Sequence, residues 1–109
     1  MAMHHAKSGE VVDLRPLGNK LAETKPTALV KTPSFEAARI VVLAGKEIPP
    51  HEVPGNVTLH CLEGCVRIAL DHTSVELAAG EWVYLDGGER HSVNGIEDSS
   101  LLMTILFDR

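Results

Sequence analysis

The sequence predicts an all-β domain, built as a sandwich or barrel of short strands. Segments rich in Val, Ile and Leu recur at intervals of about ten residues after Thr32. Most of these segments end at Gly, Asn or Asp, which tolerate the backbone angles of tight turns. The helical period is weak, centred on Leu17 and Leu21, and is enough for a single turn. Together these three observations favour strands over helices throughout the chain.

The strands are expected to follow one another with turns between them, and the 109-residue chain is the size of one domain. The expected strands are 35–43, 57–62, 65–70, 75–77, 81–85, 91–93 and 101–107. Residues 32–109 therefore form the predicted domain. Residues 1–31 are expected to form an irregular N-terminal arm, because Pro16, Gly18 and Pro26 interrupt it; 11–14 and 28–30 are its short extended candidates.

Two of the expected strands are apolar on both faces, at 39–43 and 101–107. One face of such a strand lines the core, and the other needs a second sheet, the arm or another subunit to cover it. Two-fold association is the commonest solution in oligomers. We therefore expect a homodimer, in which the arm lies across the partner subunit.

Composition and charge exclude several classes of partner. Ten Lys and Arg against fifteen Asp and Glu give a net charge of -5, with no basic cluster, so nucleic acid is not expected as a partner. No apolar stretch approaches the length of a membrane span, which is roughly 20 residues. The polar N-terminus lacks the apolar segment of an export signal, so a cytoplasmic location is expected.

The two cysteines, Cys61 and Cys65, are too few for a disulfide framework, and their spacing is not a strong zinc signature. A disulfide across the intervening turn is geometrically conceivable. In a reducing compartment, however, we expect free thiols that are buried or half-buried.

Two stretches, 45–64 and 80–94, match spaced motifs. The spacing Gly-x5-His-x-His-x3-Glu-x6-Gly is met in part by Gly45, His51 and Gly64. The spacing Gly-x5-Pro-x-Gly-x2-His-x3-Asn is met in part by Gly80, Gly88 and His91, with the Asn displaced by one residue to Asn94. In these stretches the chain resembles the cupin superfamily. The resemblance implies a cupin-type double-stranded β-helix, also called a jelly-roll barrel.

The departures from the motifs concern the metal ligands that the resemblance would imply. Metal-binding cupins take two His and a Glu from the first motif and one His from the second. Here Val53 and Val57 stand at two of the first-motif positions, and Asp86 replaces the second-motif Pro. Only His51 and His91 remain, so a divalent metal (Zn, Ni, Mn or Fe) would need further donors from water or substrate.

Strand alternation indicates which nearby side chains can join this site. If Val57 points inward, Leu59 and Cys61 share its face and His60 points out. Cys61 then lies about 13 Å along the strand from Val57, too far to replace the Glu. His60 would turn inward only through a β-bulge, and His72 is expected to be exposed in a hairpin tip.

Two functions from different classes remain open at this point. In the first, the protein binds a small organic molecule in an apolar barrel interior and performs no chemistry. The predicted ligand-binding residues are His51, Val53, Val57, Leu59, Cys61 and His91. In the alternative, it is a metal-dependent, dioxygenase- or isomerase-like enzyme that holds a divalent metal weakly through His51 and His91.

Glu52, Glu89 and Arg90, beside the histidines, are expected to form a solvated rim. In the enzyme alternative, a carboxylate of this rim would orient an imidazole by accepting its second N–H.

Overall fold

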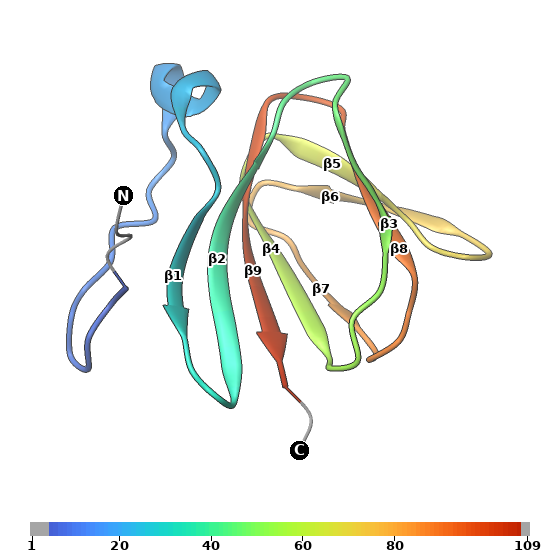
Figure 1. Ribbon diagram of the computed structural model, residues 1–109. Coiled ribbons are helices and arrows are strands. Elements are labelled where there is room, and N and C mark those ends of the chain that lie inside the picture. The colour runs from blue at the N-terminus through green and yellow to red at the C-terminus, as the bar shows by residue number, and fades with distance from the viewer. Residues whose placement is uncertain (1–4, 108–109) are drawn as a thin grey trace.

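The computed structural model describes residues 5–107 as two antiparallel sheets packed face to face (Figure 1). Sheet A has the order β1-β2-β9-β4-β7 and sheet B the order β3-β8-β5-β6. The strands are β1 (Thr27–Lys31), β2 (Phe35–Val42), β3 (Glu47–His51), β4 (Val57–Glu63), β5 (Cys65–Ala69), β6 (Ser74–Ala78), β7 (Trp82–Leu85), β8 (His91–Gly95) and β9 (Ser99–Leu106). One 3₁₀ helix, η1 (Gly18–Glu23), precedes them. The predicted all-β fold and its single turn of helix are therefore confirmed.

The core lies between the inner faces of the two sheets. Burial alternates along β4, where Val57, Leu59 and Cys61 are buried and the residues between them are half-buried. These side chains pack with buried residues of both sheets. The remaining buried apolar members of this cluster are Val42, Val66, Ile68, Leu77, Leu85, Val93 and Leu101. The barrel is thus filled by side chains through most of its length.

The end of the predicted arm belongs to sheet A. β1 pairs antiparallel with β2, from Thr27 opposite Arg39 to Lys31 opposite Glu36. Upstream of it, Leu21 of η1 is 4% exposed. The backbone N–H groups of Leu17 and Gly18 donate to the Glu63 carboxylate at 2.9 to 3.1 Å. The arm therefore docks on the sheet of its own chain, through a strand that the sequence marked only as an extended candidate.

Strand β3 was missing from the strands expected on sequence, and Pro49 and Pro50 explain why. Proline has no N–H to donate to a sheet, so two in succession disfavour a strand. β3 is one of the two edge strands of sheet B, and its pairing with β8 shifts register between Ile48 and His51, where the prolines lie. An edge strand with irregular pairing tolerates both prolines, and His51 still lies opposite His91.

The motif glycines mark the turns of the barrel. Gly45, Gly64, Gly80 and Gly88 all have positive φ, between 79° and 89°. At Gly64 a Cβ atom would also lie 2.3 Å from the carbonyl oxygen of Asp98, so this position excludes other residues on two grounds. The glycine spacing of the two motifs therefore has a direct conformational basis.

Candidate functional site

The two motif histidines meet at one end of the barrel. His51, the last residue of β3, and His91, the first of β8, are directly paired across the strands. Their ring centroids are 4.4 Å apart and the rings are tilted by 57°. His91 is only 3% exposed, whereas His51 is half-buried. The sequence thus correctly placed these two residues side by side.

Both imidazoles are oriented by backbone carbonyl groups. Nδ1 of His51 lies 3.0 Å from the carbonyl oxygen of Pro49, and Nδ1 of His91 lies 3.0 Å from that of Glu89. A carbonyl only accepts, so Nδ1 carries the proton in each neutral ring and Nε2 presents a lone pair. Within residues 5–107 neither Nε2 has a hydrogen-bond partner. The backbone, rather than the carboxylate considered on sequence, therefore prepares two acceptor nitrogens.

The other predicted site residues belong to the core or pack against it. Val53 is half-buried and packs against the core. Val57, Leu59 and Cys61 are 2%, 1% and 0% exposed, so they are in contact with other core side chains. Their shared inward face agrees with the predicted alternation, and His60 lies on the opposite face, across from Trp82. We refer to the end of the barrel that carries His51, Val53 and His91 as the barrel mouth; Val57, Leu59 and Cys61 belong to the packed core.

Two small recesses border this mouth. One, of about 180 Å³, is lined by His91 together with Pro50, Ala69, Leu70, Asp71, Arg90 and Ser92. The other, of about 340 Å³, is lined by Val53 together with Lys31, Glu36, Pro54, Gly55, Ile105 and Phe107. The rim is charged, as expected, because Arg90 lies 3.9 Å from Glu52 and both side chains are more than half exposed. The first recess therefore offers space beside His91, and the second offers space beside Val53.

The residues present do not fit a resident metal ion. Within residues 5–107 no three His, Cys, Asp or Glu side chains are arranged to hold one ion. Zn²⁺ and Fe²⁺ sites in proteins use three or more protein donors. His51 and His91 provide two nitrogen donors, and valines occupy the neighbouring ligand positions of the motif.

The thiols are also unsuited to ligation or nucleophilic chemistry. Both cysteines are free, Cys61 buried and Cys65 half-buried, as the sequence predicted. Burial raises the pKa of Cys61 to about 11, and its Sγ donates to the carbonyl oxygen of Glu63 at 3.4 Å. The thiolate form is therefore scarce at neutral pH, which leaves Cys61 as a packing residue.

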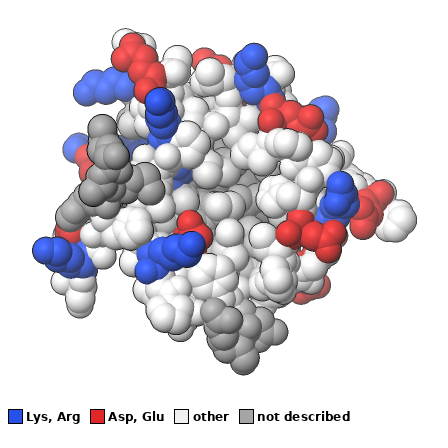
Figure 2. Space-filling view, viewed as in Figure 1, with Lys and Arg blue, Asp and Glu red and all other residues white. Residues whose placement is uncertain are grey.

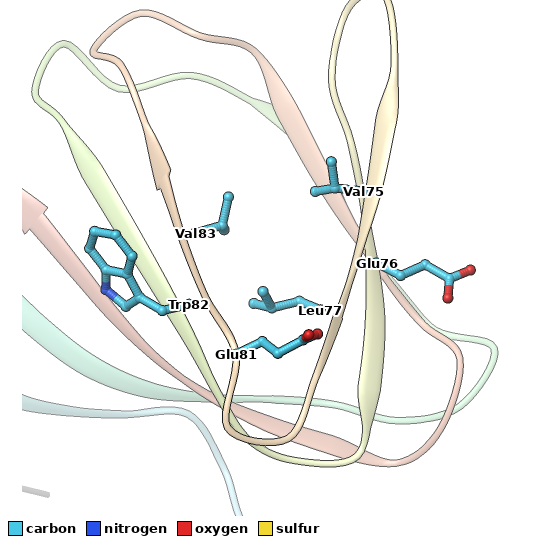
Figure 3. A pocket seen from close by; sticks show the side chains of 6 residues that line it. All are labelled: Val75, Glu76, Leu77, Glu81, Trp82 and Val83. Atoms are coloured by element: carbon cyan, nitrogen blue, oxygen red, sulfur yellow. The ribbon is translucent and has the colours of Figure 1, made fainter.

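A further hollow, not anticipated from the sequence, lies where the two sheets separate. β6 and β7 are the edge strands on this side, and they diverge from the turn that joins them (Figure 3). The hollow measures about 400 Å³ and is lined by Val75, Glu76, Leu77, Glu81, Trp82 and Val83. Leu77 and Val83 face its interior, whereas Glu76 and Trp82 point away from it (Figure 3). Both carboxylates that line it already have partners, because Glu81 accepts the backbone N–H of Ala78 and Glu76 is paired with Arg67 at 3.0 Å.

The charged side chains are unevenly distributed over the surface. On the face shown in Figure 2, Lys, Arg, Asp and Glu lie mainly toward the edge, and uncharged residues occupy the centre. Among the described residues, no helix has the length and apolar character needed to cross a membrane.

The comparisons with known proteins concern the fold. No family model matches the sequence, and no curated protein matches it either. A conserved protein of unknown function from Streptococcus pyogenes superimposes with a TM-score of 0.78 at 19% identity, over 100% of this chain and 97% of that one. A cupin superfamily protein from Desulfitobacterium hafniense gives 0.76 at 17% identity, over 90% and 95% of the two chains.

A third match, an RmlC-like cupin from Shewanella frigidimarina, has a TM-score of 0.73 at 19% identity and covers 99% of this chain and 94% of that one. At these identities the likeness concerns the arrangement of strands. It agrees with the two glycine and histidine motifs, whose turns and paired histidines the structure places as a double-stranded β-helix requires. The chain therefore has the double-stranded β-helix fold of these cupins.

Proposed function

We propose that the protein binds a small organic molecule at the barrel mouth and performs no covalent chemistry on it. The observation that carries this proposal is the pair of Nε2 atoms on His51 and His91, which have no partner within residues 5–107, whereas the Nδ1 atoms are already engaged by the backbone. Two neutral imidazoles so arranged accept hydrogen bonds. They favour a ligand with a donor group, such as a hydroxyl or an amine.

The surroundings of the histidines define the rest of the ligand. Val53 and Val57 replace the charged residues that a metal-binding member would use, so the wall beside the imidazoles is apolar. Leu59 and Cys61, on the same face of β4 as Val57, are fully buried core residues. The preferred ligand therefore has an apolar body that contacts the valines and a donor group that reaches the imidazoles.

The metal-dependent enzyme is less well supported. It requires a divalent ion held by His51 and His91 alone, with substrate and water completing the coordination sphere, which implies weak affinity. Metal analysis of protein purified without imidazole separates the two functions. Near-stoichiometric Zn, Ni, Mn or Fe, lost in His51→Ala, would favour the enzyme over the binding protein.

Benzyl alcohol and toluene are matched probes, because they share an apolar ring and differ in the hydroxyl group. We expect saturable shifts of the His51 and His91 ring resonances with benzyl alcohol and weaker binding of toluene. Loss of one neutral hydrogen bond weakens binding roughly fivefold to tenfold. His51→Ala should abolish the difference between the probes, while His60→Ala, on the outer face, should retain it. Equal binding of both probes by the parent protein would contradict the proposed role of the imidazoles.

A further inference from the structure

A second cleft lies outside the barrel, between the N-terminal arm and the outer face of sheet A. It measures about 420 Å³ and is lined by Asp13, Arg15, Pro16, Leu17, Lys20 and Arg39. Arg39 comes from β2 and the other five residues from the arm. The arm is fixed there by the bonds from Leu17 and Gly18 to Glu63, so the cleft has defined walls.

Arg39 is unusual because its guanidinium group is buried and only partly satisfied. Its side chain is 9% exposed, which is rare for arginine. Nη2 donates to the carbonyl oxygen of Arg15 at 2.7 Å, and lies 3.3 Å from Ser100 Oγ and 3.4 Å from Glu63 Oε2. Nε is buried and has no hydrogen-bond partner among the residues that the structure describes. A buried N–H of a charged group without a partner is costly, and it marks a place where an acceptor is missing.

The charges around the cleft leave a local positive excess. Arg15 is paired with Asp13 at 2.7 Å, and Arg39 is paired with Glu63 at 3.4 Å. Lys20 has no carboxylate within 4.0 Å in the part of the chain that the structure describes. The hydrogen bonds from Arg15, with a contribution from the charge of Arg39, lower the pKa of Asp13 to about 2. The chain as a whole has a net charge of -5, so a positive cleft is a local feature that favours binding of an anion.

We propose that this cleft binds a small molecule through an oxyanion group, a carboxylate or a phosphate, held between Arg39, Arg15 and Lys20. Guanidinium groups bind such anions through paired N–H donors, and a lysine adds a point charge. Arg39 belongs to the sheet and Lys20 to η1, so a bound oxyanion would bridge the two and stabilise the docked arm. This site is separate from the barrel mouth and does not depend on the histidines.

The test titrates the full chain with inorganic phosphate and with malonate, at an ionic strength held constant with NaCl. We expect saturable shifts of backbone amide resonances in residues 13–20 and at Arg39, together with slower hydrogen exchange in the arm. The stronger of the two probes identifies the oxyanion. Lys20→Ala should weaken its binding about tenfold, which corresponds to about 1.4 kcal/mol.

Lys25→Ala is the matched control, because Lys25 is an exposed lysine of the same arm that does not line the cleft. It should bind the probe as the parent does. The proposal is overturned if neither anion gives saturable shifts, if Lys20→Ala and Lys25→Ala weaken binding equally, or if the shifts spread over the whole surface. Arg39→Lys provides a second variant that keeps the charge. It should lose affinity for the probe while its far-UV spectrum stays that of the parent.

Discussion

The carboxylate of Glu63 joins the arm to the sheet through Ser100, whose hydroxyl donates to Glu63 Oε2 at 2.6 Å. The same carboxylate accepts the N–H groups of Leu17 and Gly18 and faces Arg39. Burial raises the pKa of Glu63, but the hydrogen bonds from Leu17, Ser100 and Gly18, with the charge of Arg39, outweigh this effect and lower it. One acidic residue therefore controls the docking of the arm.

This relationship predicts an acid-sensitive stability. A carboxyl group with a lowered folded-state pKa stabilises the fold above its unfolded pKa, about 4.3, and loses that contribution as the pH falls through the folded value. Glu63→Gln should therefore destabilise the protein by roughly 2 to 4 kcal/mol at pH 7, with the difference from the parent shrinking below about pH 4. Urea denaturation at a series of pH values measures it. A difference that stays constant down to pH 3 would exclude ionised Glu63 as the cause.

The turn at Gly64 gives a prediction with an internal control. Gly64 and Gly80 both have positive φ, at 83° and 89°, so Ala at either position is strained by about 1 kcal/mol. At Gly64 the new Cβ would also lie 2.3 Å from the Asp98 carbonyl oxygen, whereas nothing lies within 4 Å at Gly80. We expect Gly64→Ala to cost at least about 3 kcal/mol and Gly80→Ala about 1 kcal/mol in denaturation experiments. Equal costs would show that backbone crowding at Gly64 contributes nothing.

The valines at the mouth allow the missing ligand set to be restored. Val53→His combined with Val57→Glu places four ligands at the spacing of the first and second motifs. Val57 is 2% exposed, so the new carboxylate lacks water and, without metal, should destabilise the fold by about 2 kcal/mol or more. Titration with Zn²⁺, Ni²⁺, Mn²⁺ or Fe²⁺ should then produce tight binding and a rise in Tm that the parent does not share. If the double variant folds but binds no better than the parent, Val53 and Val57 are not at the ligand positions.

The outer face of sheet A is where we expect a second copy of the chain to associate. Trp82 and Tyr84 are 59% and 46% exposed there, and Trp82 is followed across the sheet by His60 and Leu102. The Tyr84 hydroxyl donates to the Asp86 carboxylate at 2.8 Å, and Trp82 lies beside uncharged neighbours in its row. Exposed aromatic residues are typical of the centre of an interface. Sedimentation should detect a homodimer at micromolar concentration. Trp82 is the single tryptophan, so its fluorescence should shift to shorter wavelength as the dimer forms.

Variants distinguish this face from other modes of association. Trp82→Glu should weaken the dimer about tenfold or more, since it places a charge in the centre of the interface. Val75→Glu, which adds the same charge at the edge of sheet B, should leave it intact. A monomeric parent would contradict the dimer itself. A dimer insensitive to Trp82→Glu would place the interface elsewhere.

Sequence patterns predicted the parts of this molecule that depend on local chemistry. The turn glycines and the inward face of β4 follow from φ preferences and strand alternation, and both were correct. The pairing of His51 with His91 came from the motif resemblance, because β3 carries two prolines and reads as a loop. An edge strand that contains prolines cannot be identified from its own residues, and is recognised only when its partner strand is known.

Other features were beyond the sequence because they depend on contacts between distant segments. The docking of the arm rests on Glu63, 46 residues from Leu17. The orientation of the imidazoles depends on carbonyl groups two residues earlier, whose directions are set by the backbone path into each strand. The one available signal for the buried guanidinium was a charged residue, Arg39, directly before the apolar run Ile40, Val41 and Val42 of β2.

The position of β9 has a consequence for how the protein is made. β9 follows every other strand in the domain, yet it lies between β2 and β4 in sheet A and pairs with both along nearly its whole length. A nascent chain that has produced the first eight strands still lacks the strand that joins the two halves of the sheet. Assembly of sheet A therefore waits until the whole domain has been synthesised, and until then the facing edges of β2 and β4 are open to incorrect pairing.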